Sequence, residues 1–240
     1  MLKTVIKAEI RNMTRDKMYI FFCVFPIFLG VSGYFLVPYL RDVTPVGSIV
    51  PEIVVMMLIL MTGYMFGALT AFTLLDDKDD FVLMSLKITP ISVKYYVAVK
   101  LFVSFAFGFI STVILILATN FLPDSSIWTI FMISIVAALQ APGVTLIVNS
   151  FSDNKVEGFV IMKMSGLILA VPVVAFFVYE WQEIFLIVAP GFWSARMIQI
   201  ELLSFIPTNF SIIIYFIFGF IYNLLFTYIF MKIYSKRSNI

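Results

Sequence analysis

Residues 76–100, DDKDDFVLMSLKITPISVKYYVAVK, form the longest charged interruption between two membrane-length apolar runs of this chain. Four aspartates open the stretch, at positions 76, 77, 79 and 80. Phe81, Met84 and Ile88 then recur at i, i+3 and i+7, a spacing that places them on one side of a short helix. Pro90 ends this helix, because proline cannot continue the helical hydrogen bonds. The sequence therefore predicts a short amphipathic helix over 79–89, inside a charged connection over 76–98.

The composition places this connection between membrane spans. The chain is 62% hydrophobic and 12% charged, with a mean hydropathy of +1.07, whereas soluble domains carry about 25% charged residues. A span must satisfy its backbone internally, so we expect an all-α integral membrane protein. One cysteine and no histidine exclude a disulfide framework, a zinc site and a Ser-His or Cys-His nucleophile pair. We expect no catalytic residue, no cofactor or metal, and no nucleic-acid partner.

Six apolar runs reach the roughly 20 residues that a spanning helix needs. They cover 19–40, 51–75, 99–122, 127–149, 158–179 and 210–232 within one permease-sized domain, 1–240. Pro26 predicts a kink in the first run, and Gln140, Pro142 and Gly143 predict a break in the fourth. Kinks of this kind are tolerated in lipid when neighbouring helices satisfy the freed carbonyls.

Residues 1–18 precede the first run and have the pattern of a basic amphipathic helix in the headgroup plane. Apolar residues line one face, and the other face carries Lys3, Lys7, Arg11 and Arg15. A signal peptide is the alternative, but the apolar run that follows is too long and lacks a small-residue cleavage site.

Charge sets the orientation of the spans. Fourteen lysines and arginines fall in the termini and loops of one side, against Arg41 and Arg196 on the other. Positive charge marks the cytoplasmic side. We therefore expect both termini and the 76–98 connection to be cytoplasmic, in a multi-pass protein of the bacterial plasma membrane.

Residues 180–209 are too apolar for a free loop on the outer side. Pro190 and Gly191 divide them into two pieces that are too short or too charged to span. We predict a re-entrant hairpin in the outer leaflet, anchored by Trp181 and Trp193, because tryptophan favours the interface. A seventh span is the alternative, and it would place the basic C-terminus outside.

Few polar groups fall inside the spans. Glu52, Glu157 and Lys163 lie near span ends, and no buried carboxylate is evident, which argues against an ion-coupled carrier. The uncharged polar residues Gln140, Asn149 and Asn223 are explained by interhelical hydrogen bonds or, alternatively, by a substrate path. There is no GxxxxGK[ST] loop, so ATP is not bound in that manner.

Two stretches carry a family resemblance: RNMTRDKMYIFFCVFPIFL (11–29) and LKITPISVKYYVAVKLF (86–102). Together with the order of spans, they resemble the permease subunits of ABC exporters of the type-2 permease family, also called type V exporters. The chain departs from the family pattern at Asp77 and at Asp80-Phe81, where members often carry a glutamate and a Gly-Thr pair.

The resemblance implies two permease chains, identical or related, above two separate ABC ATPase chains that hold ATP and magnesium. The connecting helix would dock on an ATPase through Asp80, Phe81, Met84, Leu86, Lys87, Ile88 and Pro90, with the N-terminal helix as a brace. The exported substrate would be an amphipathic or hydrophobic drug, lipid or peptide. The alternatives are an ATPase-independent pore or ion-coupled carrier, a membrane scaffold or immunity protein without transport, and a plain solvated loop over 79–89.

Overall fold

The computed structural model describes residues 17–86, 88, 92–178, 181–203, 206 and 208–238. These residues are mainly helical and contain no strand. The predicted N-terminal amphipathic helix, with Lys3, Lys7, Arg11 and Arg15, lies outside them except for its last two residues. Lys87 and Pro90 of the predicted docking helix also lie outside the described part.

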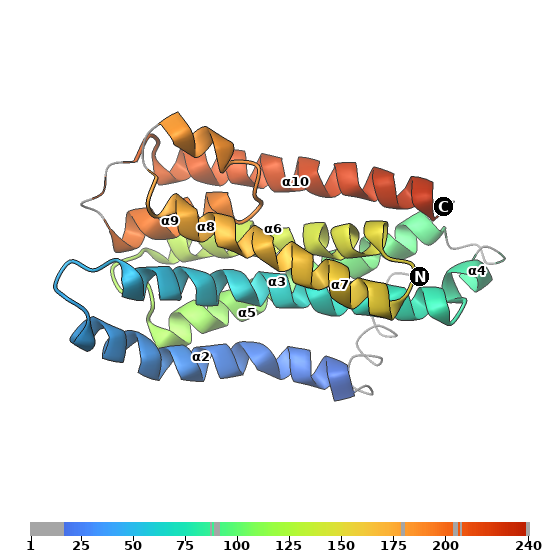
Figure 1. The fold of residues 1–240 in the computed structure, drawn as a ribbon, viewed down its shortest axis with the longest axis horizontal. Helices are drawn as coiled ribbons and strands as arrows, with labels where there is room; N and C mark the ends of the chain where they lie inside the picture. Colours follow the sequence, from blue (N-terminus) through green and yellow to red (C-terminus); the bar gives the residue numbers. More distant parts are fainter. Residues whose placement is uncertain are drawn as a thin grey trace.

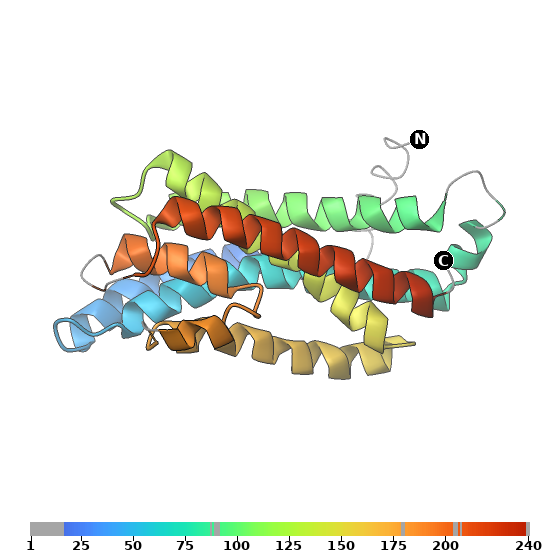
Figure 2. The same cartoon turned by 90° about the horizontal axis from the view of Figure 1, so that it is seen from above.

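Six helical stretches are long and apolar enough to cross a membrane, and they lie side by side along one axis (Figures 1 and 2). This confirms an all-helical protein with six candidate spans. The stretches are α2 (Lys17–Val43), α3 (Val50–Asp79), α5 (Val93–Thr119), α6 (Ile127–Phe151), α7 (Lys155–Ser165) continuing through η1 (Gly166–Leu169) into α8 (Ala170–Ala175), and α10 (Ile212–Arg237).

Two helix boundaries differ from the sequence prediction. Helix α3 continues to Asp79 and α5 begins at Val93, so the connection between them is shorter than 76–98. The prediction ended these helices where charged residues begin. Helix α5 begins at Val93 because the Ser92 side chain caps it by accepting from the Tyr95 N–H at 3.2 Å.

The predicted break in the fourth run does not occur, since α6 is continuous across Pro142. The irregularity falls instead in the fifth run, where the 3₁₀ turn Gly166–Leu169 separates α7 from α8. Pro172 follows two residues into α8. A proline lacks the N–H that would extend the preceding helical ladder.

Helices α3 and α6 form the centre of the bundle and pack at very short range. A Cβ on Gly63 would lie 2.5 Å from the carbonyl oxygen of Ala137, and one on Gly67 would lie 2.6 Å from that of Ala141. Small residues of this kind let two membrane helices approach closely. The α3–α6 pair is therefore the frame on which the other helices pack.

The bundle has two unlike ends (Figure 1). At one end, here called the α4 end, lie α4 (Val82–Leu86), the start of α2, the α6–α7 turn and the end of α10. At the opposite end, here called the hairpin end, lie η2 (Trp181–Phe185) and α9 (Phe192–Leu202).

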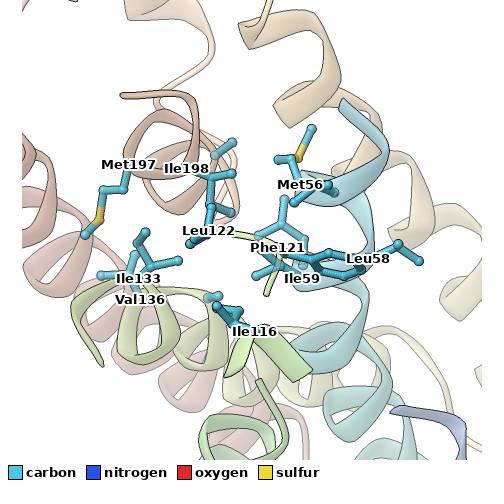
Figure 3. Packing of buried hydrophobic residues seen from close by; sticks show 14 of the residues in the cluster. Met56, Leu58, Ile59, Ile116, Phe121, Leu122, Ile133, Val136, Met197 and Ile198 are labelled. Carbon is cyan, nitrogen blue, oxygen red and sulfur yellow. The ribbon is translucent and has the colours of Figure 1, made fainter. Parts of the chain in front are cut away.

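A large apolar cluster fills the bundle toward the hairpin end. Figure 3 shows its packing, with side chains from four parts of the chain meeting in one core. Helix α9 is buried along most of its length, from Phe192 to Gln199. It rests on α3, α6, α8 and α10. A short helix with so little exposed surface is an integral part of the bundle.

The 181–202 segment thus contains η2 and α9, and the re-entrant hairpin in the outer leaflet stays a prediction. One predicted anchor is corrected. Trp181 is 70% exposed, but Trp193 is only 9% exposed and lies among the rings of Phe192, Tyr215 and Tyr222. Trp193 is a core residue because α10 covers it, a contact that the local sequence does not reveal.

Candidate functional site

Helix α4 is a short helix of five residues between the two flanking helices, α3 and α5. Leu83 anchors it, being 8% exposed and packed with Leu74, Val93 and Tyr234. On the outer side, Phe81, Met84 and Ile88 are 62%, 66% and 91% exposed. The three apolar residues of the predicted docking face therefore all point away from the bundle, while Asp80 is exposed and Leu86 is half-buried.

The turn that aims α4 is made by Asp80 and Phe81. The Asp80 N–H donates to the carbonyl of Asp76, which closes α3. Phe81 then takes a positive φ of 56°, an uncommon conformation for a residue with a side chain. The Phe81 carbonyl accepts from the backbone of Met84 and from the hydroxyl of Ser85. These bonds fix the direction in which α4 leaves α3.

Beneath α4, a buried ion pair joins the two flanking helices. Lys100 Nζ of α5 lies 2.6 Å from Asp77 Oδ2 of α3, and Lys100 is 1% exposed. The Tyr96 hydroxyl donates to the same carboxylate oxygen at 2.9 Å, and the ammonium lies 5.3 Å from the Tyr96 ring centre. Removing either charge would strand the other in a water-poor site, so the pair locks α3 to α5.

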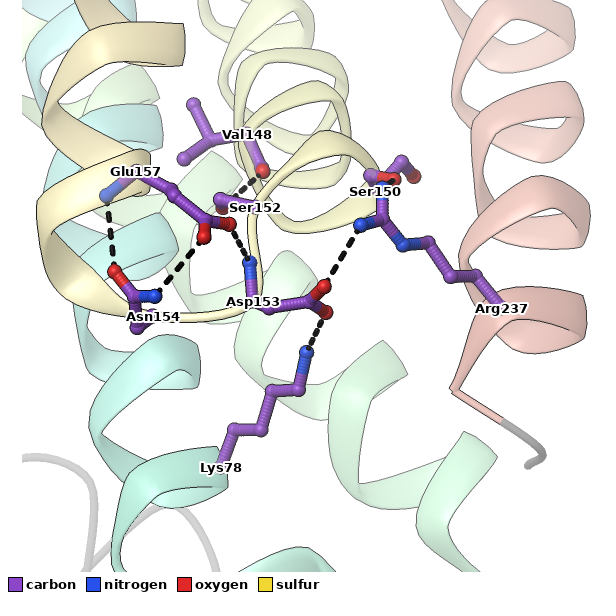
Figure 4. Close-up of polar contacts among 8 residues, drawn as sticks. All are labelled: Lys78, Val148, Ser150, Ser152, Asp153, Asn154, Glu157 and Arg237. Atoms are coloured by element: carbon purple, nitrogen blue, oxygen red, sulfur yellow. Dashed lines mark hydrogen bonds and ion pairs between the residues drawn. The ribbon is translucent and has the colours of Figure 1, made fainter.

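A second cluster ties α3 and α10 to the α6–α7 turn (Figure 4). Asp153 of the turn accepts from Lys78 Nζ at 2.6 Å and from Arg237 Nη2 at 3.0 Å. These hydrogen bonds, that from Lys78 first, lower the pKa of the Asp153 carboxyl below its usual value. Arg237 also donates to the carbonyl of Ser150 at 2.5 Å. The side chains are partly exposed, so each pair contributes little alone and the cluster acts through its three-way geometry.

The start of α7 is fixed by a capping box beside this cluster (Figure 4). Asn154 Oδ1 accepts from the Glu157 N–H at 3.0 Å, and Glu157 Oε2 accepts from the Asp153 N–H at 2.8 Å. The first bond satisfies an N–H that a helix start leaves unpaired, and the second ties Glu157 to the residue before the Asn154 cap, in a variant of the usual capping box. Lys155 pairs with Asp76 of α3. Glu157, expected only as a polar residue near a span end, is therefore a capping residue.

The hairpin end holds a second buried ion pair. Arg196 Nη2 of α9 lies 2.9 Å from Glu183 Oε2 of η2, and Arg196 is 1% exposed. Glu183 Oε1 also accepts from Asn209 at 2.6 Å and from the hydroxyl of Tyr215 at 3.4 Å. The pair holds the hairpin against the start of α10.

These two pairs correct the expectation that no carboxylate is buried. Asp77 is 9% exposed and Glu183 is 8% exposed. Arg196, which was counted as a loop charge on the outer side, is also enclosed. The sequence hides the pairs because Asp77 and Lys100 are 23 positions apart and Glu183 and Arg196 are 13 positions apart.

The three amide side chains of the spans bond to backbone carbonyls. Gln140 Nε2 donates to Leu60 O at 2.8 Å and Asn149 Nδ2 to Ala71 O at 3.1 Å, both from α6 to α3. Asn223 Nδ2 donates to Pro190 O at 3.3 Å, which links α10 to the turn before α9. Pro190 and Gly191 are themselves buried. This geometry favours interhelical bonding, and a place on a substrate path stays a prediction.

Comparison with known proteins gives one family model and two curated relatives. The family model described as fluoroquinolones export permease protein Rv2686c-like matches residues 9–231. Two curated relatives, from two strains of Mycobacterium tuberculosis, are each named as a fluoroquinolones export permease protein. Each is 22% identical over 197 residues, which cover 79% of this chain and 78% of the relative. No solved structure matches the chain.

Proposed function

This chain belongs to the Rv2686c-like family of fluoroquinolone export permeases, and on that premise we propose that it is the membrane-spanning subunit of an exporter driven by a separate ATPase. The family assignment confirms the resemblance to ABC type-2 permeases. The protein is a multi-pass membrane permease. Its energy source, substrate and subunit composition are the content of the proposal.

Three exposed apolar residues in and beside α4 are the observation that carries the proposal. Phe81, Met84 and Ile88 project from the end of the bundle, on a turn held by hydrogen bonds. Solvent-exposed apolar side chains clustered on a rigid element mark a partner-binding site. We propose that an ABC ATPase receives this face in a surface cleft.

The contacts beneath α4 support its use in coupling. A displacement of α4 reaches α3 through the closed turn at Asp80 and reaches α5 through Leu83 and the Asp77–Lys100 pair. Rigid-body transmission of this kind requires packed elements, and a flexible loop would absorb the motion. A plain solvated loop over 79–89 is less consistent with these contacts.

Charge supports a cytoplasmic α4 end. Exposed or partly exposed basic residues at that end include Lys78, Lys94, Lys155, Lys232 and Arg237, whereas Arg41 lies at the hairpin end. On the positive-inside rule, we propose a cytoplasmic α4 end with the ATPases beneath α4. Two ATPases and two permease copies complete the proposed complex, with ATP and magnesium held by the ATPases.

The relatives' names suggest the substrate. Both are named for fluoroquinolones, which are flat, amphipathic aromatic compounds. An apolar, phenylalanine-rich bundle suits cargo of that chemistry. We propose that the exported substrates are amphipathic aromatic drugs, with lipids and hydrophobic peptides as the other members of the expected class.

The test is co-purification of the permease with its ATPase after a change in α4. In a Phe81→Asp/Met84→Asp double variant, we expect loss of the ATPase, while the permease still inserts and runs as a single peak in gel filtration. Val46→Asp is the matched control, since Val46 is fully exposed in the loop at the hairpin end. An unchanged yield of ATPase with the double variant would refute docking through α4.

The buried carboxylates Asp77 and Glu183 keep an ion-coupled carrier as a second candidate. Each forms an ion pair with a lysine or arginine of a neighbouring element, which gives it a structural role in the bundle. Transport in liposomes decides between the two. Uptake that requires the ATPase and ATP supports the exporter, and uptake by this chain alone under a proton or sodium gradient supports the carrier.

A further inference from the structure

A groove runs between α5 and α10 on the outside of the bundle, with a cavity volume of about 460 Å³. Helix α6 forms its floor through Leu139 and Pro142. Its walls are almost wholly apolar and include Ala98, Phe102 and Phe105 on one side, and Leu224, Tyr228 and Met231 on the other. Phe102 and Tyr228 are 60% and 66% exposed. In a membrane, this groove opens to the hydrocarbon and suits an acyl chain.

Two lysines stand at the α4 end of the same groove. Lys94 precedes Ala98 by four residues, and Lys232 follows Tyr228 by four residues. Residues four apart lie on the same face of a helix, one turn from each other. Both lysines are exposed, and neither forms an ion pair with another residue of the described part of the chain. Each wall of the groove thus ends in an uncompensated positive charge near the headgroup level.

We propose that this groove binds an anionic phospholipid, with one acyl chain between α5 and α10 and the headgroup between Lys94 and Lys232. Basic pockets between membrane helices at the cytoplasmic side bind anionic headgroups. The apolar walls hold the acyl chain apart from the surrounding lipids, and the two lysines favour a negatively charged headgroup. This inference rests on the proposed cytoplasmic orientation of the α4 end, and it stands independently of the proposed ATPase and substrate.

A second groove provides a control within the same molecule. It lies between α2 and α5, has a cavity volume of about 470 Å³, and is lined by residues such as Ile27, Gly30, Tyr34 and Ile114. No lysine or arginine lines it or lies within four residues of its lining positions on α2 and α5, whereas Lys94 and Lys232 lie one turn from Ala98 and Tyr228 of the first groove. It is similar in size to the first groove, but it has no charge with which to select an anionic headgroup.

The experiment measures lipids retained by the purified protein. After delipidation, the protein is titrated with phosphatidylglycerol or phosphatidylcholine, and bound lipid is counted by native mass spectrometry. We expect tighter binding of phosphatidylglycerol by the unmodified protein. The Lys94→Gln/Lys232→Gln variant should bind it roughly thirtyfold more weakly, since each lysine near an anionic surface contributes about fivefold. Binding of phosphatidylcholine should be unchanged in this variant.

Four further variants separate the effect of this site from the effects of overall charge and overall hydrophobicity. Lys163→Gln removes an exposed lysine of α7 that lines neither groove, and it should have no effect. Ala98→Trp, or Leu224→Trp from the opposite wall, fills the α5–α10 groove and should displace both lipids. Gly30→Leu fills the other groove and should preserve the preference for phosphatidylglycerol.

Two kinds of result would overturn the assignment. One is equal retention of the two lipids by the unmodified protein. The other is a loss of phosphatidylglycerol that is as large for Lys163→Gln or Gly30→Leu as for the double lysine variant. Gel filtration of every variant shows whether a loss of bound lipid reflects unfolding. Each wall of the groove has its own filling variant, so that one misfolded protein does not decide the outcome.

Discussion

Lys100 of α5 and Asp77 of α3 form an ion pair of 2.6 Å inside the bundle. The pair joins the two helices that α4 connects. Both side chains are buried, and Tyr96 donates a hydrogen bond to the same carboxylate. The pair makes α3, α4 and α5 one mechanical unit. In the proposed exporter, it lies where force from an ATPase would enter the membrane domain.

Removing one partner of this pair should destabilise the protein strongly. In Lys100→Met, the Asp77 carboxylate remains buried without its cation, and we expect a loss of about 3–5 kcal/mol in the free energy of unfolding. Adding Asp77→Leu removes the stranded charge and should restore most of that stability. Thermal unfolding of the detergent-solubilised protein measures both variants. Equal stability of the single variant and the unmodified protein would show that the pair is not formed in solution.

The contact between α3 and α6 predicts a sharp difference between two glycines. Gly63→Ala places a Cβ 2.5 Å from a backbone oxygen of α6 that cannot move alone, and the overpacking should cost about 1–3 kcal/mol. Gly108→Ala is the matched control in α5, where the nearest atom lies at 3.6 Å. It should leave the unfolding temperature nearly unchanged. A similar loss in both would mean that helix–helix distance is not what the Gly63 position requires.

Gln140→Leu should test the role of the buried amide. The change removes the bond to Leu60 O, and interhelical bonds in membranes stabilise by about 0.6 kcal/mol on average. We expect a small loss of thermal stability and an unchanged substrate profile in a transport assay. A change in which drugs are exported, without a change in stability, would instead place Gln140 on the substrate path.

The Asp153 cluster predicts a pH-dependent difference. Its hydrogen bonds with Lys78 and Arg237 lower the pKa of Asp153, so its contribution to stability is present above the usual carboxyl pKa and is lost as the pH falls through the lowered value. At pH 7, Asp153→Asn should be slightly less stable than the unmodified protein, within about 1 kcal/mol because the pairs are exposed and screened. The two proteins should converge in acid.

High salt supplies the second arm of that comparison. Added sodium chloride screens exposed pairs, so the difference between Asp153→Asn and the unmodified protein should also shrink at neutral pH. Asp124→Asn is a suitable control, because Asp124 lies in the α5–α6 turn at the hairpin end and forms no ion pair with another described residue. An equal acid response for both variants would exclude the Asp153 cluster as its source.

Part of this architecture was predictable from short-range pattern. The six spans follow from the length of the apolar runs, because a membrane of fixed thickness demands a helix of fixed length. The exposure of Phe81, Met84 and Ile88 agrees with the outward face that their spacing predicts. The predicted helix over 79–89 is longer than the one found, because Asp79 belongs to α3, Phe81 lies in a turn with a positive φ, and α4 covers only Val82–Leu86. The attachment of an ATPase to that face remains a prediction from the family resemblance.

Other features depend on partners that are distant in the sequence. The local sequence around Trp193 indicates an interfacial anchor, but α10 covers this residue. The local sequence around Arg196 indicates a loop charge, but this residue pairs with Glu183 inside the bundle. The burial of Asp77 and Lys100 has the same origin, since these two residues pair between α3 and α5.

The amino-acid sequence by itself determined that this protein is a helical membrane bundle with a short amphipathic element between its second and third spans. Periodicity and run length are properties of the local sequence, and they do not depend on contacts between helices. Only the tertiary structure decided which charges are buried, which helices are locked together and which grooves stay open. Those outcomes depend on pairing across the bundle, where the low dielectric makes a partner decisive for each buried charge.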